Sequence, residues 1–215
     1  MTNEPDSQNV QNKQGILEGA QVGGDVKIGD IDQSTKNYTN KNDVKYPNYY
    51  VLLSYLKENE WQKADRETFY LMRQIAGLVD LKELSEKELS CNKSVQISCE
   101  QLDNFECEAL CAIDASWNKY SGNKFGFSVQ YEIFTKIVGE KKDITPEAWI
   151  KFGKEVDWHN GKKWIDDYVK YKTPEEIPRG HYPLDVIGGS DWENGSKQWV
   201  SKLMSRLVKC KKLPI

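Results

Sequence analysis

A glycine between two aromatic residues, Phe125-Gly126-Phe127, constrains the fold of this chain of 215 residues more than any other feature. The run is too apolar for an ordinary solvated turn, and Gly126 allows a sharp reversal that leaves both rings facing a common target. Ser128 follows as a candidate helix cap, and apolar residues recur with helical spacing over 129–137. The sequence therefore predicts a turn between two helices, which is either an ordinary buried turn or one wall of a binding site.

Helical periodicity extends over most of the chain from Tyr46 onward. Ser98 begins a capping-box pattern, and Thr145-Pro146 is a strong signal for a helix start. The apolar stripes that predict helices lie at 49–56, 61–75, 110–117, 129–137, 149–156 and 199–207. We therefore expect an all-α, compact multi-helix domain over residues 46–210.

Three segments interrupt this pattern. Residues 1–45 are rich in Asn, Gln, Asp and Gly, so they predict a polar, flexible head, although the alternation at 21–31 could form a strand or dock on a partner. Asn160-Gly161 predicts a tight reversal, whose arms are either short strands or helix ends. Residues 172–195 contain several Pro and Gly and no apolar periodicity, which is typical of a lid or a binding loop.

The charge and cysteine content exclude several classes of protein. A net charge of −3 disfavours a nucleic-acid partner. No apolar run is long enough to span a bilayer, and no signal peptide is evident, so we expect a soluble, cytoplasmic protein in a reducing compartment. The odd cysteine count and the irregular spacing predict reduced thiols without a structural metal. The five cysteines are Cys91, Cys99, Cys107, Cys111 and Cys210.

Signatures of catalysis are missing from the sequence. There is no G-x-S-x-G, no P-loop and no phosphate-binding G-x-G-x-x-G. The adjacent carboxylates Asp166-Asp167 and Glu175-Glu176 are typical of a solvated face. We therefore expect a protein that is not an enzyme.

Aromatic residues at three places favour binding of a flat ligand. Large apolar surfaces with a few polar groups are typical of sites for cofactor-sized molecules. A flat ring system with peripheral carboxylates would bury its face on the aromatics and place its acids against cations. The alternative is that these rings simply form the core. The apolar positions are the Phe125/Phe127 turn, the stripe of Trp149, Phe152 and Val156, and Trp158, and the polar groups are Lys124, His159, Arg179 and His181.

Three blocks of the sequence, in order over residues 46–187, resemble the genomes-uncoupled-four family of tetrapyrrole-binding proteins. The first block is Trp61-Gln62-Lys63-Ala64-Asp65-Arg66-Glu67-Thr68, similar to W-x-x-A-D-x-E-T. The second block is Ile113-Asp114, Trp117, Tyr120-Ser121 and Lys124-Phe125-Gly126-Phe127-Ser128-Val129-Gln130. The third block is Phe152-Gly153, Val156, Trp158 and Gly180-His181-Tyr182-Pro183.

The resemblance implies an all-helical domain with a cupped apolar crevice. Members of this family bind protoporphyrin IX and magnesium protoporphyrin IX and stimulate magnesium chelatase in chlorophyll synthesis, and they are not catalytic. The resemblance thus implies a porphyrin ligand and the large subunit of magnesium chelatase as a partner. By position, the crevice would be lined by Phe125, Phe127, Phe152, Val156 and Trp158. The loop that would border or close over it contains Arg179, Gly180, His181, Tyr182 and Pro183.

The chain also departs from the family pattern. Asp157-Trp158-His159 stands where the family has Gly-Trp-Arg, and a neutral His cannot hold a carboxylate bidentately as an Arg can. We hypothesise that His159 instead approaches the edge of the macrocycle or its metal. Tyr182 replaces a Leu, and the head does not resemble the helical domain that some members carry. The alternative function is a protein-recognition module in signalling.

Overall fold

The computed structural model describes residues 49–78, 97–139, 144–165, 171, 173–187 and 195–211. The predicted head lies outside these residues. Within them every regular element is a helix, and the one β-type pairing is an isolated bridge between His159 and Trp164. The all-α class is confirmed, and the arms of the Asn160-Gly161 reversal are neither full strands nor helix ends.

The helices begin largely where the sequence predicts. Ser98 Oγ accepts a hydrogen bond from Gln101 N while the Gln101 side chain accepts from Ser98 N, so the capping box is confirmed. Thr145 Oγ1 accepts from Ala148 N at 3.2 Å and caps the next predicted helix. The α-helices are α2 (Tyr50–Lys57), α3 (Trp61–Ile75), α5 (Cys99–Asp103), α6 (Cys107–Tyr120), α7 (Phe127–Val138), α8 (Pro146–Glu155) and α9 (Gly195–Lys211). Two 3₁₀ helices, η4 (Pro174–Glu176) and η5 (Asp185–Ile187), complete the described elements.

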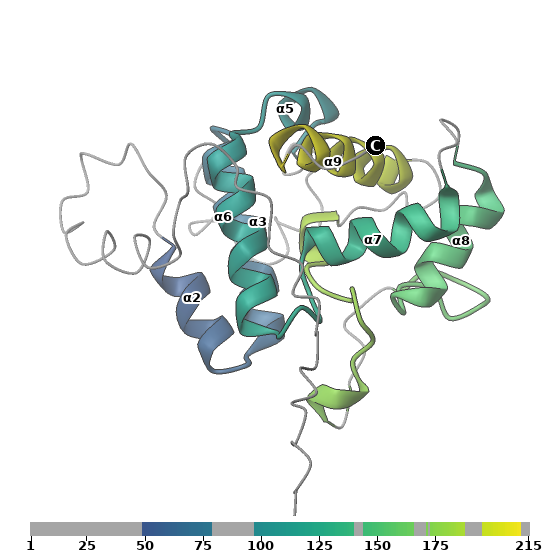
Figure 1. The fold of residues 1–215 in the computed structure, drawn as a ribbon, viewed down its shortest axis with the longest axis horizontal. Helices are drawn as coiled ribbons and strands as arrows, with labels where there is room; N and C mark the ends of the chain where they lie inside the picture. Colours follow the sequence, from purple (N-terminus) through teal and green to yellow (C-terminus); the bar gives the residue numbers. More distant parts are fainter. Residues whose placement is uncertain are drawn as a thin grey trace, which may run out of the picture.

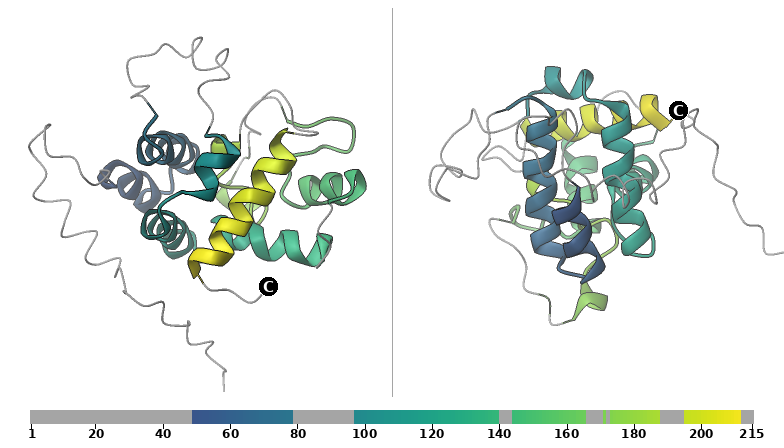
Figure 2. Two further views of the ribbon diagram at one scale, coloured as in Figure 1. Left: turned by 90° about the horizontal axis from the view of Figure 1, so that it is seen from above. Right: turned by 90° about the vertical axis from the view of Figure 1, so that its left-hand side faces the viewer.

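The C-terminal helix α9 lies across the ends of several other helices. It contacts α5, α6 and α7, while α3 packs on α2 and α8 packs on α7 (Figure 1). Seen from above, α9 crosses between the α2–α3–α6 side and the α7–α8 side of the protein (Figure 2). Helix α9 therefore joins the two sides over a shared core.

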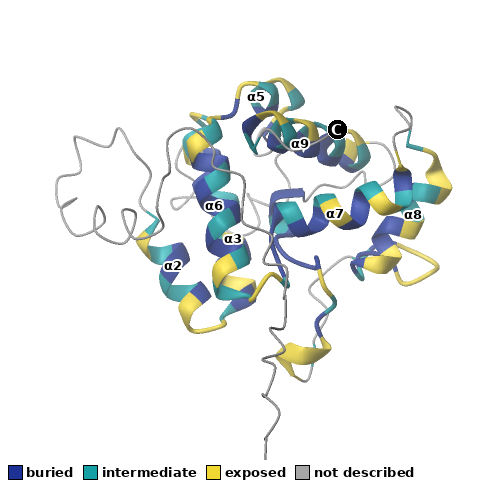
Figure 3. Ribbon diagram, viewed as in Figure 1, coloured by how far each residue is buried: buried dark blue, intermediate teal, exposed yellow. Residues whose placement is uncertain are grey.

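Buried faces of α3, α6, α7 and α9 meet in that core (Figure 3). The indole N–H groups of two core tryptophans are bonded: Trp117 Nε1 donates to Thr68 Oγ1 at 2.9 Å, and Trp199 Nε1 donates to Ile97 O at 2.8 Å. Bonding of buried indole N–H groups avoids their desolvation cost. None of the described helices has the length and apolarity needed to cross a membrane.

The prediction that all cysteines are reduced is wrong for one pair. Cys107 and Cys210 form a disulfide with their Cα atoms 5.0 Å apart, whereas Cys99 and Cys111 are free thiols. The two bonded residues are 103 positions apart in the sequence and meet because the end of α9 lies on the start of α6. Spacing along the chain carries no signal for such a long-range contact.

Candidate ligand-binding site

The Phe125-Gly126-Phe127 run joins α6 to α7 as predicted, and its backbone requires glycine. The φ angle of Gly126 is +127°, which L residues with a side chain rarely adopt. A Cβ atom on Gly126 would lie 3.0 Å from both Asp114 Oδ1 and Asn118 Nδ2 of α6. Backbone conformation and close packing therefore both demand glycine here.

The predicted cap at Ser128 is wrong, because the cap comes from the preceding helix. Gly126 occupies the N-cap position of α7, and the N–H of Ser128 donates to Asp114 Oδ1 at 2.8 Å. Ser128 Oγ instead accepts from Asn118 Nδ2 at 2.9 Å. Asp114 is fully buried, and its second carboxylate oxygen pairs with Lys211 of α9. This single carboxylate therefore connects α6, α7 and α9.

The described part of the Pro- and Gly-rich segment, residues 173–187, is here named the return loop because it runs back onto this turn. Gly126 N donates to Tyr182 O at 3.0 Å, and Gly180 N donates to Lys124 O at 2.9 Å. Two backbone hydrogen bonds therefore fix the return loop on the Phe-Gly-Phe turn. The turn and the G-H-x-P segment, predicted to belong to one site, do lie together.

Two buried polar side chains hold the return loop from the helices below it. Gln130 Nε2 of α7 donates to the carbonyl oxygens of Gly180 and Pro183 at 3.1 and 2.8 Å. Asp65 Oδ1 of α3 accepts from the backbone N–H groups of residues 184 and 185 at 2.8 and 3.0 Å. Because both side chains are fully buried, these bonds replace lost hydration and fix the loop tightly.

Phe125 belongs to an interlocked group of rings. It makes edge-to-face contacts with Trp61 and Tyr182, with ring centroids 5.3 and 5.4 Å apart. Trp117 stacks on Tyr182 at 6.0 Å with an interplanar angle of 23°. Burial raises the pKa of the Tyr182 phenol, and the charge of Asp65 adds to the effect. The ring of Tyr182, where the family has Leu, thus completes this aromatic group.

A second aromatic group lies at the end of α8 and touches the return loop. Phe152 and Trp158 meet edge-to-face with centroids 5.3 Å apart. Trp158 Nε1 donates to His181 O at 2.9 Å, and Val156 O accepts from His181 Nδ1 at 2.8 Å. Both aromatic groups therefore pack against the same loop.

The residues predicted to line a crevice are fully buried. Phe125, Phe127, Phe152, Val156 and Trp158 each expose none of their surface. In this state of the protein their side chains belong to the core. Their role as lining residues stays a prediction, because none of their surface is open to a planar ligand in this structure.

Hydrogen bonding fixes the tautomer of His159 and bears on its predicted role. Nδ1 accepts from the backbone N–H of Gly161 at 3.0 Å, so Nε2 carries the proton of the neutral ring. Burial, followed by the charge of Lys154, lowers the pKa of His159 and favours this neutral form. Nε2 is then a hydrogen-bond donor without a free lone pair. The ring can donate to a ligand, but it would bind a metal only if the Gly161 contact were broken.

His181 has the opposite tautomer. Its Nδ1 donates to Val156 O, which leaves a lone pair on Nε2. Nε2 is buried and has no hydrogen-bond partner. Burial lowers the pKa of this ring, so the neutral form is favoured. The Oε1 atom of Gln130 is a second buried acceptor without a partner beneath the return loop.

Asp157 stands at a backbone position that suits the glycine of the family pattern. Its φ angle is +58°, a left-handed conformation that Asp tolerates better than most residues. Its carboxylate accepts from the hydroxyl of Tyr171 at 2.6 Å. Burial, together with this hydrogen bond, raises the pKa of Tyr171. The departure from the family pattern thus adds a contact that a glycine could not make.

The two predicted cations lie on the surface side of the turn and the loop, and both have partners. Lys124 Nζ donates to the carbonyl oxygens of Pro174 and Glu175 at 2.9 and 3.0 Å. Arg179 Nη2 pairs with Glu132 Oε2 at 2.5 Å, with both side chains more than two-fifths exposed. Hydrogen bonds from Lys136 and Arg179 lower the pKa of Glu132, so this carboxylate is ionised at neutral pH. An anionic ligand would compete with these partners.

Asp65, Asp114 and Gln130 lie within the motif blocks, but the motifs alone predict no role for them. In the structure all three are fully buried and bond the return loop or the start of α7. The pattern that could have identified them is a polar residue on the apolar stripe of a helix, because such a residue needs a hydrogen-bond partner inside the protein.

Comparisons with known proteins give consistent results. A family model described as GUN4-like matches residues 42–198. The chain is 32% identical over 139 residues to a protein of Arabidopsis thaliana named "Tetrapyrrole-binding protein, chloroplastic", which covers 62% of this chain. The match covers 47% of that relative, so the chain spans about half of the relative's length.

Two solved structures have a similar fold. The ligand-free structure of Arabidopsis thaliana GUN4 aligns with a TM-score of 0.54 at 25% identity, over 74% of this chain and 96% of that one. The structure of GUN4 from Chlamydomonas reinhardtii aligns with a TM-score of 0.52 at 24% identity, over 81% of this chain and 97% of that one. These alignments support the all-α fold found here.

Proposed function

Because the chain belongs to the GUN4-like family, we propose that it binds a porphyrin, protoporphyrin IX or magnesium protoporphyrin IX, at the turn that the return loop covers. Its role would be that of a non-catalytic carrier, sensor or regulator in chlorophyll or tetrapyrrole biosynthesis. The large subunit of magnesium chelatase is the proposed partner. The relative's name places that protein in the chloroplast, and for this chain a cytoplasmic location stays a prediction.

The main support for this proposal is that residues of all three motif blocks form hydrogen bonds with the return loop. Asp65 of the first block and Gln130 of the second block bond this loop, and Trp158 of the third block donates to it. Large apolar rings lie directly beneath it. Displacement of the loop would expose aromatic surface suited to the face of a macrocycle.

Two buried acceptors beneath the loop can take hydrogen bonds from a ligand or from water. His181 Nε2 and Gln130 Oε1 have no partner among the described protein atoms. Opening of the loop makes both atoms available as acceptors, which offsets part of the lost packing.

Cations at the rim suit the carboxylates of a porphyrin. Lys124 lies on the turn and Arg179 lies on the loop, so each can exchange its present partner for a propionate. His159 Nε2 can add a single hydrogen bond as a neutral donor. The porphyrin would thus be held by its face on the aromatic rings and by its edge on the cations.

Titration of the purified protein with deuteroporphyrin tests this function. We expect a saturable change in Soret absorbance at about one equivalent and micromolar concentration. Combined Lys124→Gln and Arg179→Gln substitutions should weaken binding of the diacid about tenfold but leave binding of the dimethyl ester unchanged. Lys209→Gln, an exposed cation on α9, is the matched control. Absence of a saturable change would favour a protein-recognition module instead.

A further inference from the structure

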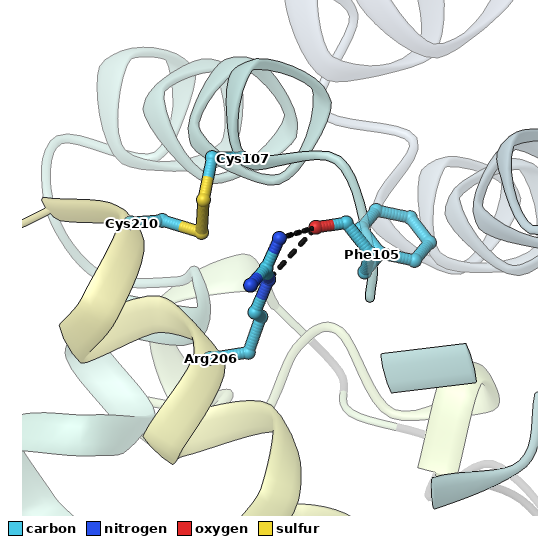
Figure 4. The surroundings of a disulfide bond; sticks show 4 residues. All are labelled: Phe105, Cys107, Arg206 and Cys210. Carbon is cyan, nitrogen blue, oxygen red and sulfur yellow. Dashed lines mark hydrogen bonds between the residues drawn. A yellow bond between two sulfur atoms is a disulfide. The ribbon is translucent and has the colours of Figure 1, made fainter. Parts of the chain in front are cut away.

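The disulfide pins the end of α9 to the start of α6. Cys107 is the first residue of α6 and Cys210 lies in the last turn of α9 (Figure 4). We propose that this bond is a thiol–disulfide exchange site for a dithiol reductant, and that its redox state controls how firmly the last turn of α9 is held. This inference goes beyond the proposed porphyrin binding and does not depend on it.

The two cysteine residues differ in exposure and in environment. Cys107 is partly exposed, whereas Cys210 is buried with 6% of its surface exposed. Cys107 also occupies the N-terminus of a helix of 14 residues, where the peptide dipoles favour a thiolate. An incoming thiolate therefore attacks the Cys107 sulfur, and Cys107 is in turn a good leaving group.

The exchange is balanced with a dithiol as the only co-reactant. Attack of its first thiolate on Cys107 Sγ forms a mixed disulfide, and the bond to Cys210 breaks and leaves a thiolate that takes up a proton. The second thiolate of the reductant then attacks the reductant's first sulfur, which is bonded to Cys107 in the mixed disulfide. Cys107 leaves as a thiolate, the protein gains two electrons and the reductant becomes a cyclic disulfide. The reverse sequence reforms the protein disulfide.

A neighbouring free cysteine does not compete in this exchange. Cys111 lies one helical turn after Cys107 on α6 and is a free thiol. Burial raises the pKa of Cys111, with Lys211 and Asp114 acting in opposite directions near it. Because the thiolate is the attacking species, a thiol with a raised pKa is a poor nucleophile at neutral pH. An external dithiol is therefore the effective reductant.

Reduction leaves most of α9 in place but removes the strongest restraint on its end. Trp199 bonds Ile97 O, and farther along the helix the guanidinium of Arg206 donates to the carbonyl oxygen of Phe105 at 2.8 Å from Nε (Figure 4). After Arg206, the side-chain bonds described for α9 are the disulfide and the pair between Lys211 and Asp114.

The Lys211 contact transmits the loosening to the start of α7. Asp114 binds Lys211 with one carboxylate oxygen and caps the N–H of Ser128 with the other. Freer motion of the last turn of α9 would therefore expose Asp114 to water and weaken this cap. Gly126, the central residue of the Phe-Gly-Phe turn, lies two residues before the capped amide.

Alkylation of the native full-length protein tests the exchange. We expect Cys107 and Cys210 to resist alkylation in the untreated protein and to be alkylated together in protein reduced with dithiothreitol. In a third sample, reduced and then treated with oxidised dithiothreitol before alkylation, both residues should resist alkylation again. The helical circular-dichroism signal should persist throughout. Alkylation of both residues without a reductant, or reduction only in denaturant, would overturn the proposal.

Hydrogen exchange separates a controlling bond from a merely structural one. Reduction should speed exchange about tenfold at residues 207–211 and at the Ser128 amide, while the α3 amides stay unchanged. Cys210→Ser should show the fast exchange without a reductant, and Cys111→Ser should behave like the unmodified protein. Equal exchange rates in the oxidised and reduced forms would refute control by this bond.

Discussion

At Gly126 a positive φ angle and a close approach to α6 act on the same residue. In a Gly126→Ala variant the new methyl group would meet Asp114 Oδ1 and Asn118 Nδ2 at 3.0 Å, with the backbone in a strained conformation. We expect the free energy of unfolding to fall by about 2–4 kcal/mol in chemical denaturation.

Gly122→Ala is the matched control for this substitution. Gly122 also has a positive φ angle, +61°, but a Cβ atom there would meet nothing within 4 Å. Gly122→Ala should therefore lower the free energy of unfolding by only about 1 kcal/mol, the cost of the strained backbone conformation. If both variants lost the same free energy of unfolding, the close approach of Gly126 to α6 would not contribute to stability.

The buried histidine His181 predicts how stability depends on pH. Burial lowers its pKa below the ordinary value of 6.5, so the unfolded chain binds more protons than the folded one between the lowered pKa and 6.5. The contribution of His181 is present above 6.5 and is lost as the pH falls through this window. His159, with a pKa also lowered by burial, acts in the same direction.

A His181→Gln variant isolates this effect. Glutamine keeps an N–H donor and an acceptor oxygen, but it does not titrate. We expect unfolding free energies measured by denaturation between about pH 7 and 5.5 to fall less steeply in the variant. A pH slope identical to that of the unmodified protein would contradict a buried, neutral His181.

The return loop depends on a carboxylate far away in the sequence. Asp65 accepts two backbone N–H groups at the start of η5 and is fully buried. Asp65→Ala should lower the free energy of unfolding by about 2–4 kcal/mol and should make residues 173–187 sensitive to protease, because one buried and one partly buried N–H donor lose their acceptor. Asp65→Asn, which keeps one acceptor oxygen, should lose less.

Asp103→Ala provides the comparison for Asp65→Ala. Asp103 on α5 forms an ion pair with Lys202 at 2.7 Å, and both side chains are about two-fifths exposed. Its removal should cost less than about 1 kcal/mol. If Asp103→Ala were as damaging as Asp65→Ala, burial of the Asp65 carboxylate would not explain its importance.

Local signals predicted the helices well. Ser98 and Thr145 cap helices where the sequence indicated, since a side-chain oxygen and an amide three residues later meet within one turn. The cap of α7 could not be predicted in this way. Its acceptor, Asp114, lies 14 residues before Ser128 on another helix.

The sequence predicted that two parts of the candidate site meet, whereas the role of the site residues in binding stays a prediction. The motif blocks placed the Phe-Gly-Phe turn and the return loop together, and their backbone hydrogen bonds confirm that contact. The sequence left open whether Phe125 and Trp158 line a site or belong to the core, and in the structure both are fully buried. Periodicity and motifs identify apolar residues, but whether a ring faces a ligand or another ring depends on packing between distant segments.

The disulfide adds a covalent restraint across nearly half of the chain. It closes a loop with a sequence separation of 103 residues. Loop-closure entropy predicts that Cys107→Ser lowers the free energy of unfolding of the oxidised protein by roughly 3–5 kcal/mol. Cys111→Ser, measured in the same denaturation experiment, should change it by less than about 1 kcal/mol. A loss no larger than that control would show that the bond barely restricts the unfolded chain.

The fold places the proposed porphyrin site between two sides of the protein that α9 holds together. The return loop donates hydrogen bonds to Asp65 of α3 and accepts them from α7 and from the segment after α8. Opening of the loop therefore breaks contacts on both sides of the protein. Porphyrin binding should therefore change the loop first and leave α2 and α5 as they are.

Hydrogen exchange of the full-length protein with and without saturating deuteroporphyrin is the most direct measurement. The proposed function predicts altered exchange at the Gly126 and Gly180 amides and across residues 173–187, because these amides bond the loop to the turn. An unchanged exchange pattern at saturating porphyrin, or changes confined to α2, α5 or α9, would contradict binding beneath the return loop.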